Sequence, residues 1–113
     1  MAEYVPVCPT AELGPGEVRE VEAHGEKLAL LNIGQTYYAL SAACPNDGTN
    51  LAREGRLDGD ALVCPNDGWA FDVRTGERVR PRGGPALRRR AIAVKDNQVL
   101  IGPRLPEAFR GAA

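Results

Sequence analysis

The sequence Cys-Pro-Asn-Asp-Gly occurs twice in this 113-residue chain, at Cys44–Gly48 and again at Cys64–Gly68. Each copy follows an apolar run, so we expect each to form a loop that leaves a strand. The proline fixes the backbone directly after the cysteine, and the glycine permits a tight exit from the loop. If the two loops face each other, they bring two thiols and carboxylates into one small space, which is the geometry of a metal or iron–sulfur site. The simpler alternative is two turns whose cysteines are small buried hydrophobic residues.

Around the loops, short apolar runs alternate with turn residues, and helical periodicity is almost absent. This pattern predicts an all-β domain, an antiparallel barrel or sandwich. In the segment Arg90–Ile101, two strands are expected to pair across a turn at Lys95–Gln98. Nothing resembles a linker, so residues 1–113 are expected to form one domain. The apolar runs are Tyr4–Val7, Leu28–Ile33, Tyr37–Leu40, Ala61–Val63, Ala91–Val94 and Val99–Ile101.

The composition excludes several classes of protein. The net charge of −1 argues against a general nucleic-acid binder, and no apolar stretch approaches the length of a membrane span. Residues Met1–Thr10 show no pattern of a secretory signal, and the cysteine count of 3 is odd. We therefore expect a reduced, cytoplasmic setting rather than a disulfide framework.

The stretch from Cys44 to Glu77 resembles the cluster-binding region of Rieske-type ferredoxins. That family has Cys-Pro-His-x-Gly in a first loop and Cys-Pro-x-His-Gly in a second. The resemblance extends to Gly55–Asp60 before the second loop, to Gly68–Asp72 after it, and to the proline-rich segment Pro81–Pro85. It implies a Rieske-type fold with a small two-loop cluster-binding subdomain at about residues 43–85. It also implies an electron carrier with a [2Fe-2S] cluster, rather than an enzyme.

The ligand positions depart from the family at two places. Cys44 and Cys64 occupy the cysteine positions, whereas Asn46 and Asp67 stand where the family has histidines. The only histidine, His24, is expected in a distant turn. A Rieske centre holds one iron by two cysteines and the other by two histidines. The resemblance therefore implies that the cofactor-binding positions are Cys44, Asn46, Cys64 and Asp67, with Asp47 as a further candidate metal ligand.

Three readings of this site remain open. A cluster could use Cys44 and Cys64 on one iron and carboxylates from Asp47 and Asp67 on the other, because the Asn46 amide is a weak ligand. Alternatively, the fold has lost its cluster and serves as a binding or assembly subunit, resembling the small subunit of some nitrite reductases, with two thiols that are free or disulfide-bonded. Finally, the sequence is an engineered ligand variant, or the two thiolates and two carboxylates hold another cation such as zinc.

The expected partner is a redox protein, an oxygenase or a reductase. Seven arginines between Arg74 and Arg90 are either solvated strand residues or a docking patch for an acidic partner. Aromatic residues are not interleaved with these arginines, so nucleic-acid binding is not expected. We also expect a monomer that does not bind membranes. Cys8 is expected to be a buried core residue, and Trp69 and Phe71 are expected to pack under the loops.

Overall fold

The computed structural model describes residues 3–106, which form short strands and one 3-10 turn. No α-helix occurs among these residues, so none of them forms a helix long and apolar enough to cross a membrane. The elements are β1 (Val5–Pro9), η1 (Thr10–Glu12), β2 (Val18–Ala23), β3 (Glu26–Ile33), β4 (Thr36–Ser41), β5 (Arg56–Asp58), β6 (Ala61–Val63), β7 (Ala70–Asp72), β8 (Arg78–Arg80), β9 (Arg89–Lys95) and β10 (Gln98–Arg104).

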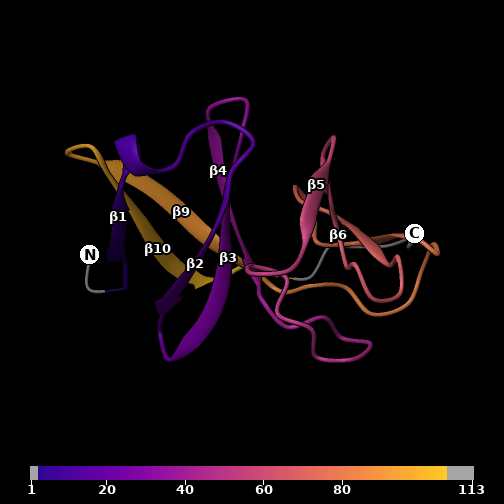
Figure 1. Ribbon diagram of the computed structural model, residues 1–113. Helices are drawn as coiled ribbons and strands as arrows, with labels where there is room; N and C mark the ends of the chain where they lie inside the picture. Colours follow the sequence, from indigo (N-terminus) through magenta and orange to yellow (C-terminus); the bar gives the residue numbers. More distant parts are fainter. Residues whose placement is uncertain (1–2, 107–113) are drawn as a thin grey trace, which may run out of the picture.

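The larger lobe is an antiparallel sheet of six strands in the order β1-β10-β9-β4-β3-β2. Its two edge strands, β1 and β2, also contact each other, so the sheet nearly closes into a barrel. Figure 1 shows this lobe on one side of the molecule, with the connections to the second lobe leaving from the ends of β4 and β9. The all-β antiparallel class predicted from the sequence is confirmed.

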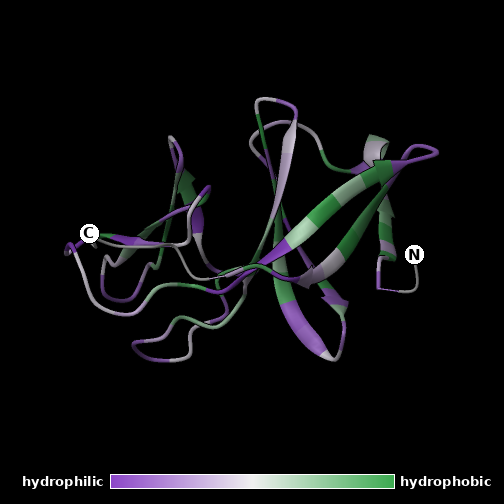
Figure 2. Ribbon diagram, turned by 180° about the vertical axis from the view of Figure 1, so that it is seen from behind, coloured by the Kyte–Doolittle hydropathy of each residue, from purple (hydrophilic) through white to green (hydrophobic). Residues whose placement is uncertain are grey.

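The hairpin predicted at Arg90–Ile101 is present as β9 and β10. Val94 pairs with Val99, and Lys95 pairs with Gln98. The turn between them contains Asp96 and Asn97, both with positive φ, at 53° and 63°. Two successive residues of this conformation make the tight turn that matches the twist of paired strands. In Figure 2 this turn is hydrophilic, whereas the strands it joins carry hydrophobic segments.

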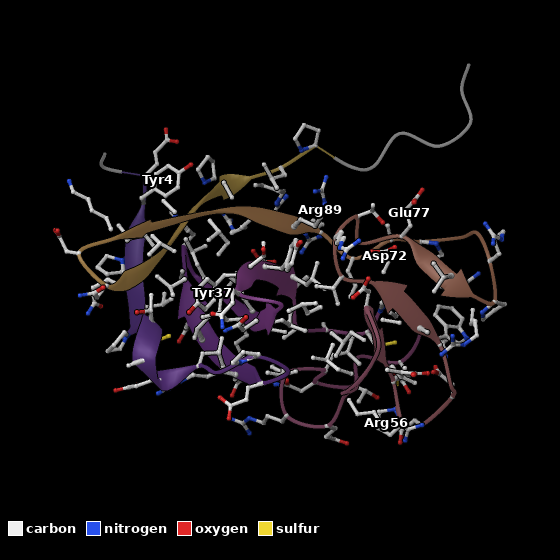
Figure 3. The ribbon with its side chains drawn as sticks, turned by 90° about the horizontal axis from the view of Figure 1, so that it is seen from above. Tyr4, Tyr37, Arg56, Asp72, Glu77 and Arg89 are labelled. Atoms are coloured by element: carbon white, nitrogen blue, oxygen red, sulfur yellow. The ribbon has the colours of Figure 1, made fainter. Side chains whose placement is uncertain are left out.

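The smaller lobe is a second antiparallel sheet in the order β5-β6-β7-β8, whose strands have three residues each. The two Cys-Pro-Asn-Asp-Gly loops border it, one after β4 and the other between β6 and β7. Figure 3 shows Arg56, Asp72 and Glu77 at this end of the molecule, with Tyr4 and Tyr37 in the other lobe. The small two-loop subdomain expected beside the barrel is therefore present.

Two hydrophobic cores meet at β3, which explains why its central residues 28–31 are all apolar. Successive side chains of a strand point to opposite faces. Leu28 and Leu30 accordingly pack in the barrel core, and Ala29 and Leu31 pack in the core shared with the smaller lobe. The shared core extends across the second sheet to Phe71, which is fully buried. The cysteine loops therefore rest on a rigid, packed base.

Candidate metal centre

The two loops Cys44–Gly48 and Cys64–Gly68 have the same backbone structure. In each loop the glycine N–H donates to the cysteine carbonyl, at 2.8 Å in the first loop and 3.0 Å in the second. Each cysteine N–H donates to the carbonyl of the residue after the glycine, which is Thr49 at 2.9 Å or Trp69 at 2.8 Å. Both glycines have positive φ, 80° and 76°, which only glycine adopts without strain. Identical sequences thus form identical turns.

The loops face each other and bring four potential ligands together. The thiols of Cys44 and Cys64 and one carboxylate oxygen each from Asp47 and Asp67 all lie within 4.8 Å of one another. The cysteines are buried, with 2% and 0% of their surface exposed, whereas both aspartates are exposed. The resulting site has two sulfur donors on the protein side and two oxygen donors on the solvent side.

Hydrogen bonds from the residue two positions after each aspartate stabilise the ionised form of its carboxylate. The Asp47 carboxylate accepts hydrogen bonds from the hydroxyl and backbone N–H of Thr49, at 2.6 and 2.9 Å, and these lower the pKa of Asp47. The Asp67 carboxylate accepts from the backbone N–H of Trp69 at 2.9 Å, which is the main cause of its lowered pKa. A hydrogen bond to the charged form favours that form, so both side chains are ionised at neutral pH.

Asparagine side chains link one loop to the other. The Asn46 amide nitrogen donates to the Asp67 carboxylate, and the Asn66 amide nitrogen donates to the Thr49 hydroxyl at 2.8 Å. Asn46 is therefore a partner of a candidate ligand rather than one of the four clustered donors. Sequence reasoning missed Asn66 and Thr49, because their roles depend on how the loops face each other. The position of Asn66 in the duplicated motif was the available signal, and Thr49 directly follows the first copy.

Two of the three cysteines, Cys44 and Cys64, lie in the candidate site, and the third, Cys8, lies in the barrel core. Cys44, Cys64 and Cys8 are all free thiols. Burial raises the pKa of Cys44, while backbone N–H groups of Asn46 and Asp47 near its sulfur oppose this effect. Cys8 lies in the barrel core, as expected from the sequence, with 3% of its surface exposed.

These residues do not fit a histidine-ligated Rieske centre. The buried thiol pair fits the iron that such a centre holds by two cysteines. The positions for the other iron carry Asn46 and Asp67, which hydrogen bond to each other. His24, the only histidine of the chain, lies in the turn between β2 and β3 and contacts the Ile101 carbonyl through Nε2 at 2.9 Å. No imidazole therefore faces the loops.

A barrel that supports two facing cysteine loops on a small second sheet defines a two-loop metal-binding domain. The family model that matches residues 3–95 of the chain is the Rieske [2Fe-2S] domain. Because this match covers most of the sequence, the chain belongs to the Rieske [2Fe-2S] domain family. The resemblance stated from the two loops is confirmed, and the family implies a [2Fe-2S] cluster among its members.

Relatives and solved structures agree with this assignment. The chain is 38% identical over 74 residues to the ferredoxin CarAc of Metapseudomonas resinovorans, covering 65% of this chain and 68% of the relative. It is 29% identical over 98 residues to the biphenyl dioxygenase ferredoxin subunit of Pseudomonas sp. strain KKS102, covering 87% and 90%. The ferredoxin-containing complex of carbazole 1,9a-dioxygenase includes a chain that matches with a TM-score of 0.81 and 32% identity, over 88% of this chain and 93% of that one.

The fold is also shared with a protein assigned as a nitrite reductase (NADPH) small subunit. This structure matches with a TM-score of 0.75 and 23% identity, over 87% of this chain and 96% of that one. At this level of identity the match shows the fold alone.

Proposed function

We propose that the chain is a small ferredoxin component that carries electrons in a multicomponent oxygenase or reductase system and catalyses no reaction of its own. Cys44, Cys64, Asp47 and Asp67 would hold iron, and the bound iron would supply the redox couple. The observation that carries this proposal is the cluster of four donor atoms within 4.8 Å, in a chain whose relatives are ferredoxins of oxygenase systems. The ligand set is the one that the sequence predicted for a [2Fe-2S] cluster, with the carboxylates of Asp47 and Asp67 serving in place of the family's two histidines.

The carboxylates change the expected reduction potential. Histidine ligands are neutral, and they keep Rieske potentials at roughly −150 to +300 mV, whereas all-thiolate clusters lie near about −400 mV. Asp47 and Asp67 add negative charge, which disfavours the extra electron. We therefore expect a potential below the Rieske range and no histidine-linked pH dependence.

Protein-film voltammetry of the iron-loaded full chain tests the proposal. A reversible one-electron couple is expected within the range of iron–sulfur proteins, about −700 to +450 mV. Cys44→Ala and Cys64→Ala should each abolish the couple. Cys8→Ala is the matched control, because this buried cysteine lies in the barrel core, and it should retain the couple. Iron-loaded protein that shows no couple would refute the electron-carrier function.

The docking surface that we propose is the arginine-rich side of the smaller lobe. Several of its arginines are already in ion pairs, such as Arg74 with Asp60 at 3.1 Å and Arg80 with Asp58 at 3.5 Å. The Arg78 guanidinium lies 3.9 Å above the centre of the Trp69 ring, at the exit of the second loop. Arg82 is exposed in the neighbouring proline-rich segment. An acidic oxygenase or reductase face would meet these groups next to the metal.

Charge reversal tests this surface. Arg82→Glu should slow electron exchange with the partner at low salt, and the difference should fade as salt screens the charges. Lys95→Glu is the control, because Lys95 is exposed at the end of β9, in the hairpin that Figure 1 shows at the far side of the larger lobe. Equal effects of the two variants would argue against docking on the arginine-rich side.

We further propose that the component is a cytoplasmic monomer. Val94 is the one large hydrophobic residue exposed among residues 3–106, so this part of the chain offers no broad apolar face for self-association. The free thiols are consistent with a reducing compartment. Light scattering after size-exclusion chromatography should give the mass of one chain.

A second candidate is a cluster-free binding or assembly subunit. The hydrogen bond between Asn46 and Asp67 favours it, because that bond joins the two loops through the positions at which the family has histidines. The fold shared with a nitrite reductase small subunit is compatible with it. A colourless, metal-free protein that refuses reconstitution with iron would support this candidate and refute the electron carrier.

A further inference from the structure

We propose that the two loops form one tetrahedral site for a single iron ion, with Cys44, Asp47, Cys64 and Asp67 as its four ligands, rather than a site for a two-iron cluster. Other divalent ions that accept tetrahedral sulfur and oxygen ligands, such as Zn²⁺ and Co²⁺, bind in the same place. The choice of iron rests on the electron-carrier function proposed above. The argument for a single tetrahedral ion rests on the geometry of the site and is independent of that function.

The spacing of the ligands is the first argument. The Rieske motif is asymmetric, with histidine two residues after the first cysteine and three residues after the second. Here the acidic ligand follows its cysteine by three residues in both loops, as Asp47 and Asp67. Because the loops also share one backbone structure, they present identical Cys-x-x-Asp ligand pairs. Two such pairs facing each other match the symmetry of one tetrahedral ion.

The distances are the second argument. Two ligand atoms on one ion lie at most twice the bond length apart, which is about 4.6 Å for two sulfurs at a zinc–sulfur bond of about 2.3 Å. A cluster with bridging sulfides adds the length of the bridge between the ligands of one iron and those of the other. All four donor atoms lie within 4.8 Å of one another, close to this limit. The donors are therefore compact enough to close around one ion after a small movement of the exposed aspartate side chains.

The hydrogen bonds around the carboxylates are the third argument. Metal-binding carboxylates are themselves oriented by hydrogen-bond donors. Asn46 donates to Asp67 from the opposite loop, and Thr49, which donates to Asp47, accepts from Asn66 of the opposite loop. The duplicated asparagines thus fix both carboxylates across the site, which gives the second residue after each cysteine a role other than ligation.

Titration of the reduced, metal-free full chain with Co²⁺ under nitrogen tests the single-ion site. We expect saturation at one Co²⁺ per chain, with the intense visible bands of tetrahedral cobalt and a thiolate charge-transfer band. Asp47→Asn and Asp67→Asn preserve the size of the side chain and should each weaken Co²⁺ binding at least about tenfold. Asp96→Asn, in the β9–β10 turn, should bind like the wild-type chain, and circular dichroism checks that each variant is folded.

Three outcomes would overturn the site: saturation at two Co²⁺ per chain, octahedral spectra, or unchanged binding in both aspartate variants. The electron-carrier function fails separately. One tetrahedral Co²⁺ in a chain whose iron form shows no redox couple would refute the carrier and support the single-ion site. Two irons with two acid-labile sulfides in a redox-active protein would support the carrier and refute the single-ion site.

Discussion

At the scale of single residues, Asn46 and Asp67 set this chain apart from the histidine-bearing motif of its family. They occupy the two positions that the family motif gives to histidine, and they hydrogen bond to each other. Each position still belongs to a loop with the proline, the glycine and the buried cysteine of the motif. The backbone that presents a Rieske cluster is therefore present, while the chemistry offered to the second iron is different.

Restoring the histidines is the corresponding prediction. The double variant Asn46→His/Asp67→His should assemble a two-iron cluster on reconstitution with iron and sulfide. Its potential should lie in the Rieske range of roughly −150 to +300 mV, because the second iron regains neutral ligands. Iron and sulfide analysis with voltammetry measures both properties.

The control places two histidines at equivalent positions of the two loops. Asn46→His/Asn66→His carries the same number of imidazoles but lacks the asymmetric spacing of the family motif. It should not assemble a Rieske cluster. If both double variants stay free of cluster, Asn46 and Asp67 do not occupy the family's ligand positions.

At the scale of elements, most strands could be predicted from the sequence, and the reason for each exception is physical. The apolar runs Leu28–Ile33 and Val99–Ile101 lie within β3 and β10, because burial requires such runs. The edge strand β2 was missed, since Glu20 and Glu22 interrupt its apolar positions. Strands β5 and β8 were also missed, because each has three residues, none of them buried, and each is held by its pairing with a neighbouring strand.

The residues of the candidate site were predictable from the sequence, but their contacts were not. The duplicated motif identified the two cysteines and both aspartates, because each depends on local spacing alone. The cross-loop bonds of Asn46 and Asn66 depend on how two segments meet in space. No pattern within either loop specifies that arrangement.

Glu20 ties the edge strand β2 to the segment between the two loops. Its carboxylate accepts hydrogen bonds from Asn50 at 2.8 Å and from Arg53 at 2.6 Å, and these lower the pKa of Glu20. Because the pKa of Glu20 is lowered in the folded chain, its ionised carboxylate stabilises the fold at pH values above the ordinary glutamate pKa of 4.5. That contribution is lost as the pH falls through the lowered pKa.

Glu20→Gln should therefore destabilise the chain near neutral pH and flatten the acid side of its stability profile. Urea unfolding at about pH 7 and about pH 3 measures the difference from the wild-type chain, which should shrink in acid. Glu22→Gln, an exposed carboxylate on the same strand, should show a smaller effect. A difference that is constant across the pH range would contradict the role assigned to Glu20.

The turn between β7 and β8 is clamped against the segment that precedes β9. Gly76 has a φ of 80°, and its carbonyl accepts the Leu87 N–H at 2.8 Å. A Cβ at this position would collide with the Leu87 carbonyl oxygen. Gly76→Ala should therefore destabilise the chain by about 2–4 kcal/mol, combining backbone strain and overpacking.

Gly59→Ala is the matched control for this prediction. Gly59 has a similar φ of 61°, but a Cβ there would have nothing within 4 Å. It should cost only about 1 kcal/mol, from the backbone conformation alone. Urea denaturation measures both variants, and equal losses would show that the contact with Leu87 does not matter.

At the scale of the whole molecule, the two sheets are joined by one core. Ala29, Leu31 and Leu40 of the larger sheet pack in the same cluster as Leu62 and Phe71 of the smaller one. Two sheets that share a core are expected to unfold together. We therefore propose that the chain is one cooperative domain, in which the loops cannot open without disturbing the barrel.

Phe71→Ala tests this cooperativity. Removing a fully buried phenylalanine should cost about 3–5 kcal/mol. Trp69 is the only tryptophan and reports on the smaller lobe by fluorescence, while circular dichroism follows the strands of both lobes. The two transitions should coincide in the wild-type chain and shift together in the variant. A fluorescence transition that precedes the circular dichroism transition would reveal two separate units.

We infer that a Rieske fold here holds one metal ion between two Cys-x-x-Asp loops. The most direct test is the iron and acid-labile sulfide content of the full chain, purified without oxygen. A single-ion site predicts about one iron per chain and no labile sulfide. Two irons and two labile sulfides per chain would contradict it.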